Sequence, residues 1–423
     1  MLTLQALRHD RPAVEAALAK RGLDAAPLLD QILQLDLQRR TTQKEVDDLK
    51  AQQNAASREI GELFKAGKKD EAEARRAEVG TLKEKIHQLD EQQKALIQQQ
   101  ETALLELPNR PHDSVPAGQS EDDNEVVAEE GTKPDLGGAA KPHWELADQY
   151  RLIDFEAGVK ITGAGFPVYR GKGAKLQRAL IQFFLDRADA AGYEEFIPPH
   201  VVNADSGRGT GQLPDKEGQM YHCTEDDLYL IPTAEVPLTN LFRGDLLKAD
   251  DLPIQLCGYT PCFRREAGSY GKDVRGLNRL HQFDKVEIVR FETPENSYAA
   301  LDGMVEHVRG LLRELELPFR TLRLCGGDLG FTSALTYDLE VWSAAQERWL
   351  EVSSVSNFET YQANRLQCRF RNADGKTELV HTLNGSALAL PRIVAALLEN
   401  HQTEDGIRIP AALQPYTGFD RIA

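Results

Sequence analysis

A repeat of apolar residues at alternating spacings of four and three fills the N-terminal part of the chain and limits what that part can fold into. The first run starts at Leu28 and the second ends at Ala103. Heptad spacing places one stripe along a helix, so the two runs predict two long helices that pack through their stripes. The repeat positions are Leu28, Ile32, Leu35, Arg39, Thr42, Val46, Leu49, Gln53, Ala56, Ile60 and Leu63, then Val79, Leu82, Ile86, Leu89, Gln93, Leu96, Gln100 and Ala103.

A glycine, Gly67, lies between the two runs. Glycine commonly ends a helix, and two helices of similar length joined by a short turn pack antiparallel. With about 38 residues per helix, the hairpin is an arm of roughly 55 Å. Polar stripe positions such as Arg39 and Gln53 favour an intramolecular hairpin over a long parallel rod.

The pattern leaves two interpretations of this arm open. It is either a solvated hairpin used for dimerisation or spacing, or an arm that contacts a phosphate backbone. In the second case the contacts come from basic side chains along it, namely Arg39, Arg40, Lys44, Lys50, Arg75 and Arg76.

The chain as a whole is acidic, with 50 Lys+Arg against 67 Asp+Glu and a formal charge of -17. A protein that coats nucleic acid is excluded, because phosphate binding needs a high density of cations, although a local basic surface remains compatible with this charge. The sequence has no stretch of about 18 uncharged apolar residues and no secretory signal pattern, so we expect no membrane span.

Five cysteines occur without any C-x-x-C pair. Sparse, unpaired cysteines predict reduced thiols and a cytoplasmic location. Cys223, Cys257 and Cys262 with His222 form a conceivable ligand set, but structural zinc sites usually show short paired spacings, so no zinc is expected.

Glycines and prolines interrupt the helical pattern from Leu107 to Pro142, which places a boundary between domains 1–106 and 107–423. Beyond the boundary, runs of strands with inserted helices and no repeated βα unit predict a mixed α+β domain around an antiparallel sheet. The expected helices are 172–191, 296–315 and 386–400, and the expected strands are 227–231, 254–263, 281–291, 338–342, 348–354 and 365–371.

The segment 261–287 is the richest in chemistry-bearing side chains. The sequence has no phosphate-binding glycine loop of the G-x-x-x-x-G-K-[ST] type, so a nucleotide site would consist of side chains on a sheet. Two strands joined by a glycine-bearing loop would bring together Arg264, Glu266, Phe283 and Glu287. These supply a guanidinium for phosphate, an aromatic ring for a base and carboxylates for an amine. A polar hairpin with cross-strand salt bridges is the alternative interpretation.

The order of these motifs resembles the seryl-tRNA synthetases of the bacterial type, which are class II aminoacyl-tRNA synthetases. The resemblance covers essentially the whole chain, including the N-terminal arm. The segments that carry it are 109–124 (NRPHDSVPAGQSEDDN), the end of the first class II motif near Pro199, 209–214 (GTGQLP), 232–240 (PTAEVPLTN), the second motif at 261–287, 351–357 (EVSSVSN) and the third motif, 383–392 (LNGSALALPR). Ala387 and Pro391 depart from the glycines frequent in the third motif.

The resemblance implies a class II antiparallel sheet flanked by helices, an N-terminal tRNA-binding arm and a homodimer. It implies that serine and ATP, with Mg²⁺, give seryl-adenylate, and that the seryl group then passes to a serine tRNA, or to a selenocysteine tRNA where one exists.

The resemblance also implies residue roles at matching positions. Arg264 should bridge the α-phosphate and the serine carboxylate, and Arg392 should meet the outer phosphates, both as catalytic residues. Ser386 would bind serine and could also cap the helix that follows. The implied serine contacts are Thr233, Ala234, Glu235, Arg264, Glu287 and Ser386. The implied ATP contacts are Arg264, Arg265, Glu266, Phe283, Glu351, Val352, Ser353, Ser354 and Arg392, of which Glu351 and Ser354 would hold Mg²⁺.

For the tRNA, the resemblance points to the arm and to the basic loop of the second motif. The expected contacts are Arg39, Arg40, Lys44, Lys272, Arg275 and Arg279. Three alternatives remain open: a paralogue that loads a carrier protein, a class II synthetase for another amino acid such as threonine or proline, and a non-catalytic coiled-coil protein. A carrier-loading paralogue should lack a full arm, and a non-catalytic protein should lack Arg264, Glu351 or Arg392.

Overall fold

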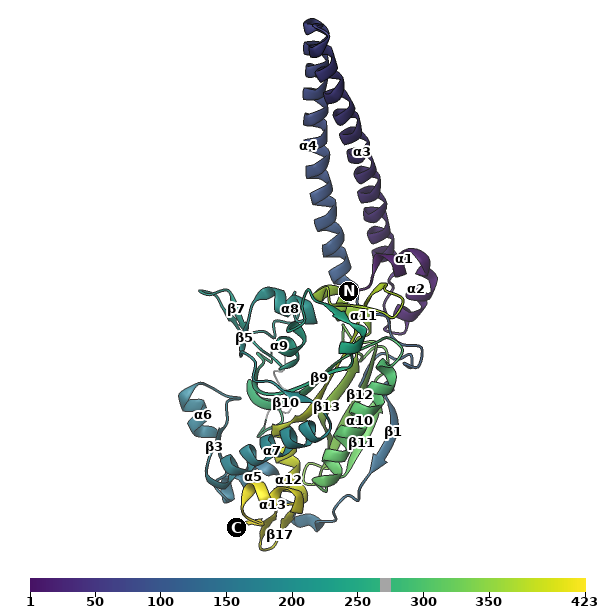
Figure 1. The fold of residues 1–423 in the computed structure, drawn as a ribbon. Coiled ribbons are helices and arrows are strands. Elements are labelled where there is room, and N and C mark those ends of the chain that lie inside the picture. Colours follow the sequence, from purple (N-terminus) through teal and green to yellow (C-terminus); the bar gives the residue numbers. More distant parts are fainter. Residues whose placement is uncertain (267–274) are drawn as a thin grey trace. The chain divides into compact units, whose positions relative to one another are not determined.

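The computed structural model describes residues 1–266 and 275–423. The chain forms two compact units. One comprises Leu2–Ala19 and Leu23–Pro108, here called the arm unit, and the other comprises Met1, Lys20–Gly22 and Asn109–Ala423, here called the sheet unit (Figure 1). No helix among the described residues is long and apolar enough to cross a membrane.

The arm unit contains the predicted helical hairpin. Helix α3 spans Ala26–Lys65 and helix α4 spans Lys69–Glu106, and the two lie side by side along their length (Figure 1). Gly67 has a φ of 74°, a conformation that glycine adopts without strain, so it makes the tight turn between them. The short helices α1 (Leu4–His9) and α2 (Arg11–Ala19) precede the hairpin.

The stripe between α3 and α4 mostly follows the heptads and departs from them near the start of α3. Most buried positions are repeat positions, such as Ile32, Val46 and Ile86. The expected stripe residue Leu35 is only half buried, and its neighbour Asp36 is fully buried instead. Periodicity cannot reveal this shift, because the reason is a tertiary contact with α1.

That contact is an ion-pair cluster around Asp36. Arg8 of α1 donates from Nε at 2.8 Å and from Nη2 at 2.6 Å to the two carboxylate oxygens. Arg40 adds a hydrogen bond at 3.0 Å and Arg39 another at 3.4 Å. Burial by itself would raise the pKa of Asp36, but the hydrogen bond and charge of Arg8 keep it below its ordinary value.

The sheet unit is built on a sheet of eight strands among the described residues, in the order β1-β11-β12-β13-β16-β10-β9-β4. Neighbouring strands pair antiparallel, except β4 and β9, which are parallel. The predicted mixed fold around an antiparallel sheet is confirmed. The strands are β1 (Glu125–Glu130), β4 (Glu194–Glu195), β9 (Ile254–Phe263), β10 (Gln282–Glu292), β11 (Phe319–Arg323), β12 (Leu335–Ser343), β13 (Arg348–Asn357) and β16 (His381–Ala389).

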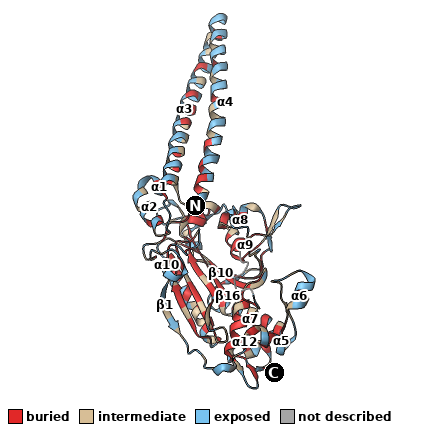
Figure 2. Ribbon diagram, turned by 180° about the vertical axis from the view of Figure 1, so that it is seen from behind, coloured by how far each residue is buried: buried red, intermediate tan, exposed pale blue. Residues whose placement is uncertain are grey.

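Helices α7, α10 and α12 cover one face of this sheet. Apolar side chains from alternate strand positions, such as Val286, Ile288 and Val355, pack with them into the main core, seen as red along β10 and β16 in Figure 2. The intervening positions point to the other face. There α9 and α11 cover only one end, around Val289 and Phe291, so part of that face stays open. The helices are α5 (His143–Gln149), α6 (Phe155–Ile161), α7 (Gly171–Ala190), α8 (Ala204–Thr210), α9 (Glu235–Asn240), α10 (Ser297–Glu314), α11 (Thr360–Leu366), α12 (Leu390–Asn400) and α13 (Gln414–Thr417).

Two of the expected elements were wrong in their bounds. The predicted helix 386–400 is strand up to Ala389 and helix only from Leu390, because 386–389 complete the pairing of β16 with β10. The predicted strand 365–371 begins as the end of α11 and is strand only from Arg369. The short strands are β2 (Ile153–Asp154), β3 (Val168–Tyr169), β5 (Val201–Val202), β6 (His222–Cys223), β7 (Leu228–Leu230), β8 (Leu246–Lys248), β14 (Arg369–Arg371), β15 (Thr377–Leu379), β17 (Gln402–Thr403), β18 (Gly406–Arg408) and β19 (Arg421–Ile422).

The buried Asp36 predicts a charge-dependent contribution to the stability of the arm unit. Asp36→Asn should lower the free energy of unfolding by about 1–3 kcal/mol at pH 7, because three arginines lose their shared partner. Since the folded pKa is lowered, this contribution is complete above the ordinary pKa near 4 and is lost as the pH falls through the folded value. Urea unfolding followed by circular dichroism measures it, with the exposed Asp47→Asn on the same helix as control. An equal loss in both variants contradicts the prediction.

Candidate active site

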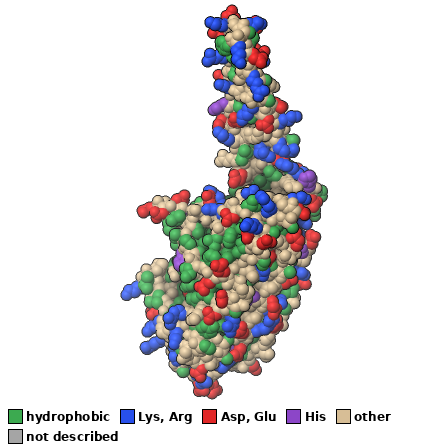
Figure 3. Space-filling model, viewed as in Figure 1, with side chains coloured by type: hydrophobic (Ala, Val, Ile, Leu, Met, Phe, Trp, Pro, Cys, Tyr) green, Lys and Arg blue, Asp and Glu red, His purple; other side chains and the backbone are tan. Residues whose placement is uncertain are grey.

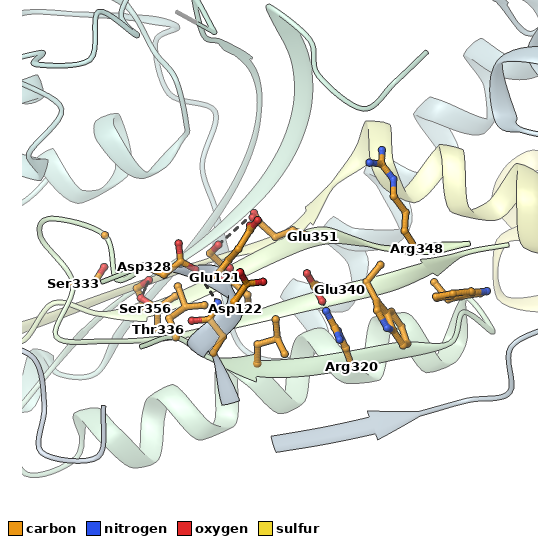
Figure 4. A pocket seen from close by; sticks show the side chains of 18 of the residues that line it. Glu121, Asp122, Arg320, Asp328, Ser333, Thr336, Glu340, Arg348, Glu351 and Ser356 are labelled. Atoms are coloured by element: carbon orange, nitrogen blue, oxygen red, sulfur yellow. Dashed lines mark hydrogen bonds and ion pairs between the residues drawn. The ribbon is translucent and has the colours of Figure 1, made fainter. Parts of the chain in front are cut away.

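The open face of the sheet carries an acidic cavity of about 690 Å³. Its floor is formed by β11, β12 and β13, on the face opposite the main core (Figure 4). Two arginines, Arg320 and Arg348, line it together with seven carboxylates, which are Glu121, Asp122, Asp328, Asp338, Glu340, Glu347 and Glu351. The excess of carboxylates suits a cation rather than a bare anion.

A β-bulge brings Glu351 and Ser354 into this cavity together. Residues three apart on a regular strand point to opposite faces. In β13, however, Glu351 pairs with Glu340 and Ser353 pairs with Leu339, so Val352 is the extra residue. The Ser354 hydroxyl therefore lies 3.5 Å from Glu351 Oε1. The predicted Mg²⁺ ligands thus share one face, while Val352 is buried in the main core.

The surroundings of Asp338 indicate whether these residues fit Mg²⁺. Asp338 lies opposite Ser354 in the pairing of β12 with β13. Its side chain is buried and its Oδ1 has no hydrogen-bond partner. Burial, and then the charge of Glu351, raise the pKa of Asp338 well above its ordinary value. Among the described residues no cluster of three or more His, Cys, Asp or Glu side chains could hold a metal alone. Carboxylates that lack compensating charge fit an ion of the Mg²⁺ type, which completes its shell with water and phosphate oxygens.

Arg392 connects the cavity to the start of α12. It lies in the first turn of that helix, after Pro391. Its Nη1 donates to the carbonyl of Glu351 at 2.6 Å, and its Nε donates to the carbonyl of Asn278 at 3.3 Å. The two carbonyls hold the guanidinium beside the predicted Mg²⁺ ligands.

Arg264 and Phe283 lie together, as the hairpin of the second motif predicted. The pairing of β9 with β10 sets Phe283 opposite Cys262, and the amide of Arg264 donates to the carbonyl of His281. The centre of the Arg264 guanidinium lies 5.3 Å from the centre of the Phe283 ring. A planar cation beside an aromatic ring suits a nucleotide, since one binds phosphate and the other a base.

A pair of buried carboxylates lies next to this arginine. The Thr233 hydroxyl donates to Glu287 Oε2 at 3.3 Å, and Lys285 Nζ lies 2.6 Å from the same oxygen. Glu235 accepts a hydrogen bond from Gln362 at 2.7 Å. Burial, and then the charge of Glu287, raise the pKa of Glu235 to about 7. This acidic recess would neutralise an ammonium group.

Ser386 lies opposite Glu287 in the pairing of β16 with β10. Cross-strand neighbours share a face, so Ser386 adds a hydroxyl to the recess. The expectation that Ser386 caps a helix was wrong, because α12 begins four residues later, with Ala389 at its N-cap position. The carbonyl of Ser386 accepts a hydrogen bond from the Ser353 hydroxyl of β13 at 2.6 Å, so the observed contact of Ser386 is with the neighbouring strand.

The expected grouping of Glu266 with Glu287 differs from the structure. Strand β9 ends at Phe263, as expected, so Glu266 lies three residues beyond the strand. The backbone of Glu266 has a φ of 48°, and its carboxylate pairs with Arg279 at 3.0 Å. Glu266 is thus placed against Arg279 and not beside Glu287. The backbone amide of Arg265 donates to the carbonyl of Gln219.

The basic residues expected to contact tRNA fall into three groups. Lys272 lies outside the described residues. In the sheet unit, Arg275 stacks over Trp144 at 4.8 Å and Arg279 pairs with Glu266. In the arm unit, Arg39 and Arg40 bind Asp36 and Lys44 is exposed, and Figure 3 shows basic and acidic side chains interleaved along the arm.

Sequence reasoning missed several members of the site. Gln362 donates to Glu235 and accepts from Thr382, and Lys285 pairs with Glu287. Gln362 and Thr382 are neutral and belong to distant segments, so neither spacing nor charge pointed to them. Alternation along the predicted strand 281–291 could have placed Lys285 on the same face as Glu287.

Comparisons with known proteins agree with this geometry. The model "Seryl-tRNA synthetase N-terminal domain" matches residues 1–111, and "tRNA synthetase class II core domain (G, H, P, S and T)" matches residues 221–401. A serine--tRNA ligase of Salinibacter ruber is 56% identical over 424 residues, which cover 100% of this chain and 99% of that protein. The chain belongs to the seryl-tRNA synthetase family. A serine--tRNA ligase of Chlorobium luteolum is 50% identical, with 100% of this chain and 99% of that protein covered.

Solved structures of the family share the whole fold. The crystal structure of seryl-tRNA synthetase from Pyrococcus horikoshii complexed with ATP has a TM-score of 0.93 and 37% identity, covering 100% of this chain and 99% of that one. The cytoplasmic serine-tRNA ligase of Naegleria fowleri in complex with AMP has a TM-score of 0.89 and 25% identity, covering 100% and 98%. The resemblance inferred from the motifs is therefore confirmed.

The raised pKa of Glu235 predicts a pH-dependent stability. An unfolded glutamate ionises near pH 4.3, whereas folded Glu235 keeps its proton up to about pH 7. The contribution of Glu235 to stability is therefore complete below about pH 4 and is lost as the pH rises towards 7. Glu235→Gln keeps the bond from Gln362, so it should be nearly neutral at about pH 4 and stabilising by roughly 2–3 kcal/mol at about pH 8. Urea denaturation at both pH values measures this, and an equal effect at both would refute the assignment.

Proposed function

We propose that serine activation takes place on the open face of the sheet, and that the residues described above have separate roles in this reaction and in tRNA charging. The chain activates serine with ATP and charges tRNA with it, as follows from its full-length match to serine--tRNA ligases. The observation that carries the residue assignment is the position of Arg264. Its guanidinium lies 5.3 Å from the centre of the Phe283 ring, and its positive charge acts on the buried carboxyl of Glu235.

In this proposal Arg264 contacts both substrates at once. Attack of the serine carboxylate on the α-phosphorus brings two anions together, so the barrier includes their repulsion. A guanidinium that donates to both lowers that barrier, since its fixed fork matches carboxylate and phosphate. Phe283 stacks on the adenine and Arg392 binds the outer phosphates.

The recess around Glu287 binds the amino acid. Glu287 neutralises its ammonium group, and the approach of this cation favours the ionised form of Glu235 as well. Thr233 and Ser386 offer partners to its hydroxyl. Alanine is rejected because it would leave these buried polar groups unpaired. Threonine is rejected by the limited space beside Ala234, which is fully buried.

Glu351 and Ser354 would hold Mg²⁺. Asp338 is near enough that its negative charge would partly balance the positive charge of the ion. When bound, the ion supplies positive charge to the phosphates. The protein's part is to keep Glu351 and Ser354 on one face through the bulge at Val352, and to fix Arg392 on the carbonyl of Glu351.

The arm and the basic side chains bind the tRNA. The arm residues Arg39, Arg40 and Lys44 contact phosphates, and so do Lys272, Arg275 and Arg279 beside the ATP site. Recognition is by shape and backbone, which reconciles an RNA partner with an acidic chain. The enzyme acts as a homodimer in the cytoplasm, without zinc, and nothing favours a carrier protein as acceptor.

Amino-acid-dependent exchange of pyrophosphate into ATP tests the activation step. With Mg²⁺ and each of the twenty amino acids, we expect exchange with serine alone. Glu287→Gln should lower kcat/KM for serine by about 100-fold or more, since it removes a charge that contacts the ammonium group. Asp284→Asn, on the opposite face of the same strand, should have little effect. Exchange with another amino acid, or unchanged serine kinetics in Glu287→Gln, would overturn the pocket assignment.

Deletion of residues 36–98 tests the arm. Adenylate formation should persist, because the sheet unit has its own core and contains every residue assigned to the first reaction. Charging of serine tRNA should be lost. The matched measurements are pyrophosphate exchange and tRNA charging on the same purified variant. If charging survives, the arm is a structural spacer.

A further inference from the structure

A buried network outside the proposed site connects α5 to α12. His143 at the start of α5 and Glu399 in α12 are both fully buried. His143 Nδ1 lies 2.7 Å from Glu399 Oε1, and the backbone amide of His143 donates to the same oxygen at 3.0 Å. The Ser343 hydroxyl donates to the other oxygen. None of these residues belongs to the sets assigned to serine, ATP or Mg²⁺.

The contacts of His143 define its proton arrangement. The backbone amide of Leu277 donates to His143 Nε2 at 2.9 Å. Nε2 therefore accepts, and Nδ1 carries the proton and donates to Glu399. Burial disfavours the charge on Glu399, but the hydrogen bonds from His143 and Ser343 outweigh it and lower its pKa. The pair is a neutral imidazole bridging a buried carboxylate to a backbone amide.

That amide belongs to the segment 275–280, which leads into β10 and is here called the loop root. The loop root approaches His143 closely: a Cβ added at Gly276 would lie 2.2 Å from His143 Nε2. Gln346 joins both sides, because it donates to Glu399 at 3.1 Å and accepts from Asn278 at 3.1 Å. Leu277 and Asn278 are buried.

The loop root in turn holds Arg392. The carbonyl of Asn278, the residue after Leu277, accepts the bond from Arg392 Nε at 3.3 Å. Arg392 and Glu399 lie on the same helix, two turns apart. One network thus fixes the helix that carries the arginine and the loop that orients it.

We propose that His143 and Glu399 are positioning residues for Arg392, setting its guanidinium for the outer phosphates of ATP. The inference rests on the proposed function of Arg392. Without His143, the amide of Leu277 and the carboxylate of Glu399 lose a partner, and the loop root moves away from α12. Displacement of a positioning group by about 1 Å can cost on the order of 100-fold in rate.

Steady-state pyrophosphate exchange on the full-length enzyme tests this role. His143→Leu should raise KM for ATP about tenfold or more while KM for serine changes little. His143→Gln should restore much of the loss, because its amide can accept from Leu277 and donate to Glu399. His401→Leu is the matched control: His401 is also buried, lies at the end of α12 and bonds the carbonyl of Leu315 instead. It should lower Tm without changing KM for ATP.

A double-mutant cycle separates positioning from general stability. If His143 acts through Arg392, the effects of His143→Leu and Arg392→Ala on KM for ATP should be strongly non-additive. Additive effects, or equal KM changes for ATP and serine, would refute the proposal. Should His143→Leu fail to fold, Gly276→Ala carries the same test, because it separates the loop root from the ring and leaves the buried pair intact.

Pyrophosphate exchange by the wild-type enzyme distinguishes a failure of this inference from a failure of the proposed function on which it rests. Absence of serine-dependent exchange in the wild type would overturn the proposed function. Normal wild-type exchange with unchanged ATP kinetics in both His143→Leu and Gly276→Ala would overturn the positioning role alone.

Discussion

The proposed serine recess and the pairing of Arg264 with Phe283 depend on the antiparallel pairing of β10 with its two neighbours. Pairing with β9 sets Phe283 opposite Cys262, two residues before Arg264. Pairing with β16 sets Glu287 opposite Ser386. A slip of one residue would turn Glu287 into the core and Ile288 into the recess. Burial of the apolar positions on the helix-covered face therefore fixes the register that aligns the polar ones.

The site concentrates carboxylates that are costly to bury. Glu235 and Asp338 both have raised pKa values, because burial and a neighbouring carboxylate disfavour their charged forms. Stability alone would favour neutral side chains at these positions. The proposed ligands, an ammonium group beside Glu235 and a metal ion beside Asp338, would bring the positive charge that compensates these carboxylates.

The two units owe their stability to separate sets of contacts. The arm unit has its own stripe and the ion pairs around Asp36, whereas the sheet unit packs α7, α10 and α12 on the sheet. This independence is compatible with the proposed assignment of serine activation to the sheet unit and of tRNA contacts partly to the arm unit. Local basic contacts of the proposed kind would reconcile an RNA partner with an acidic chain.

The sequence by itself determined the arm, the mixed fold and the family, because heptads, strand runs and motifs are local patterns. Pairing partners that lie far apart in the chain decided the rest. The bulge at Val352 turned Glu351 and Ser354 to one face, and pairing with β10 kept Ser386 in a strand. The partners of Asp36 and His143 are likewise set by packing between elements, which no local periodicity encodes, so only the tertiary structure could show them.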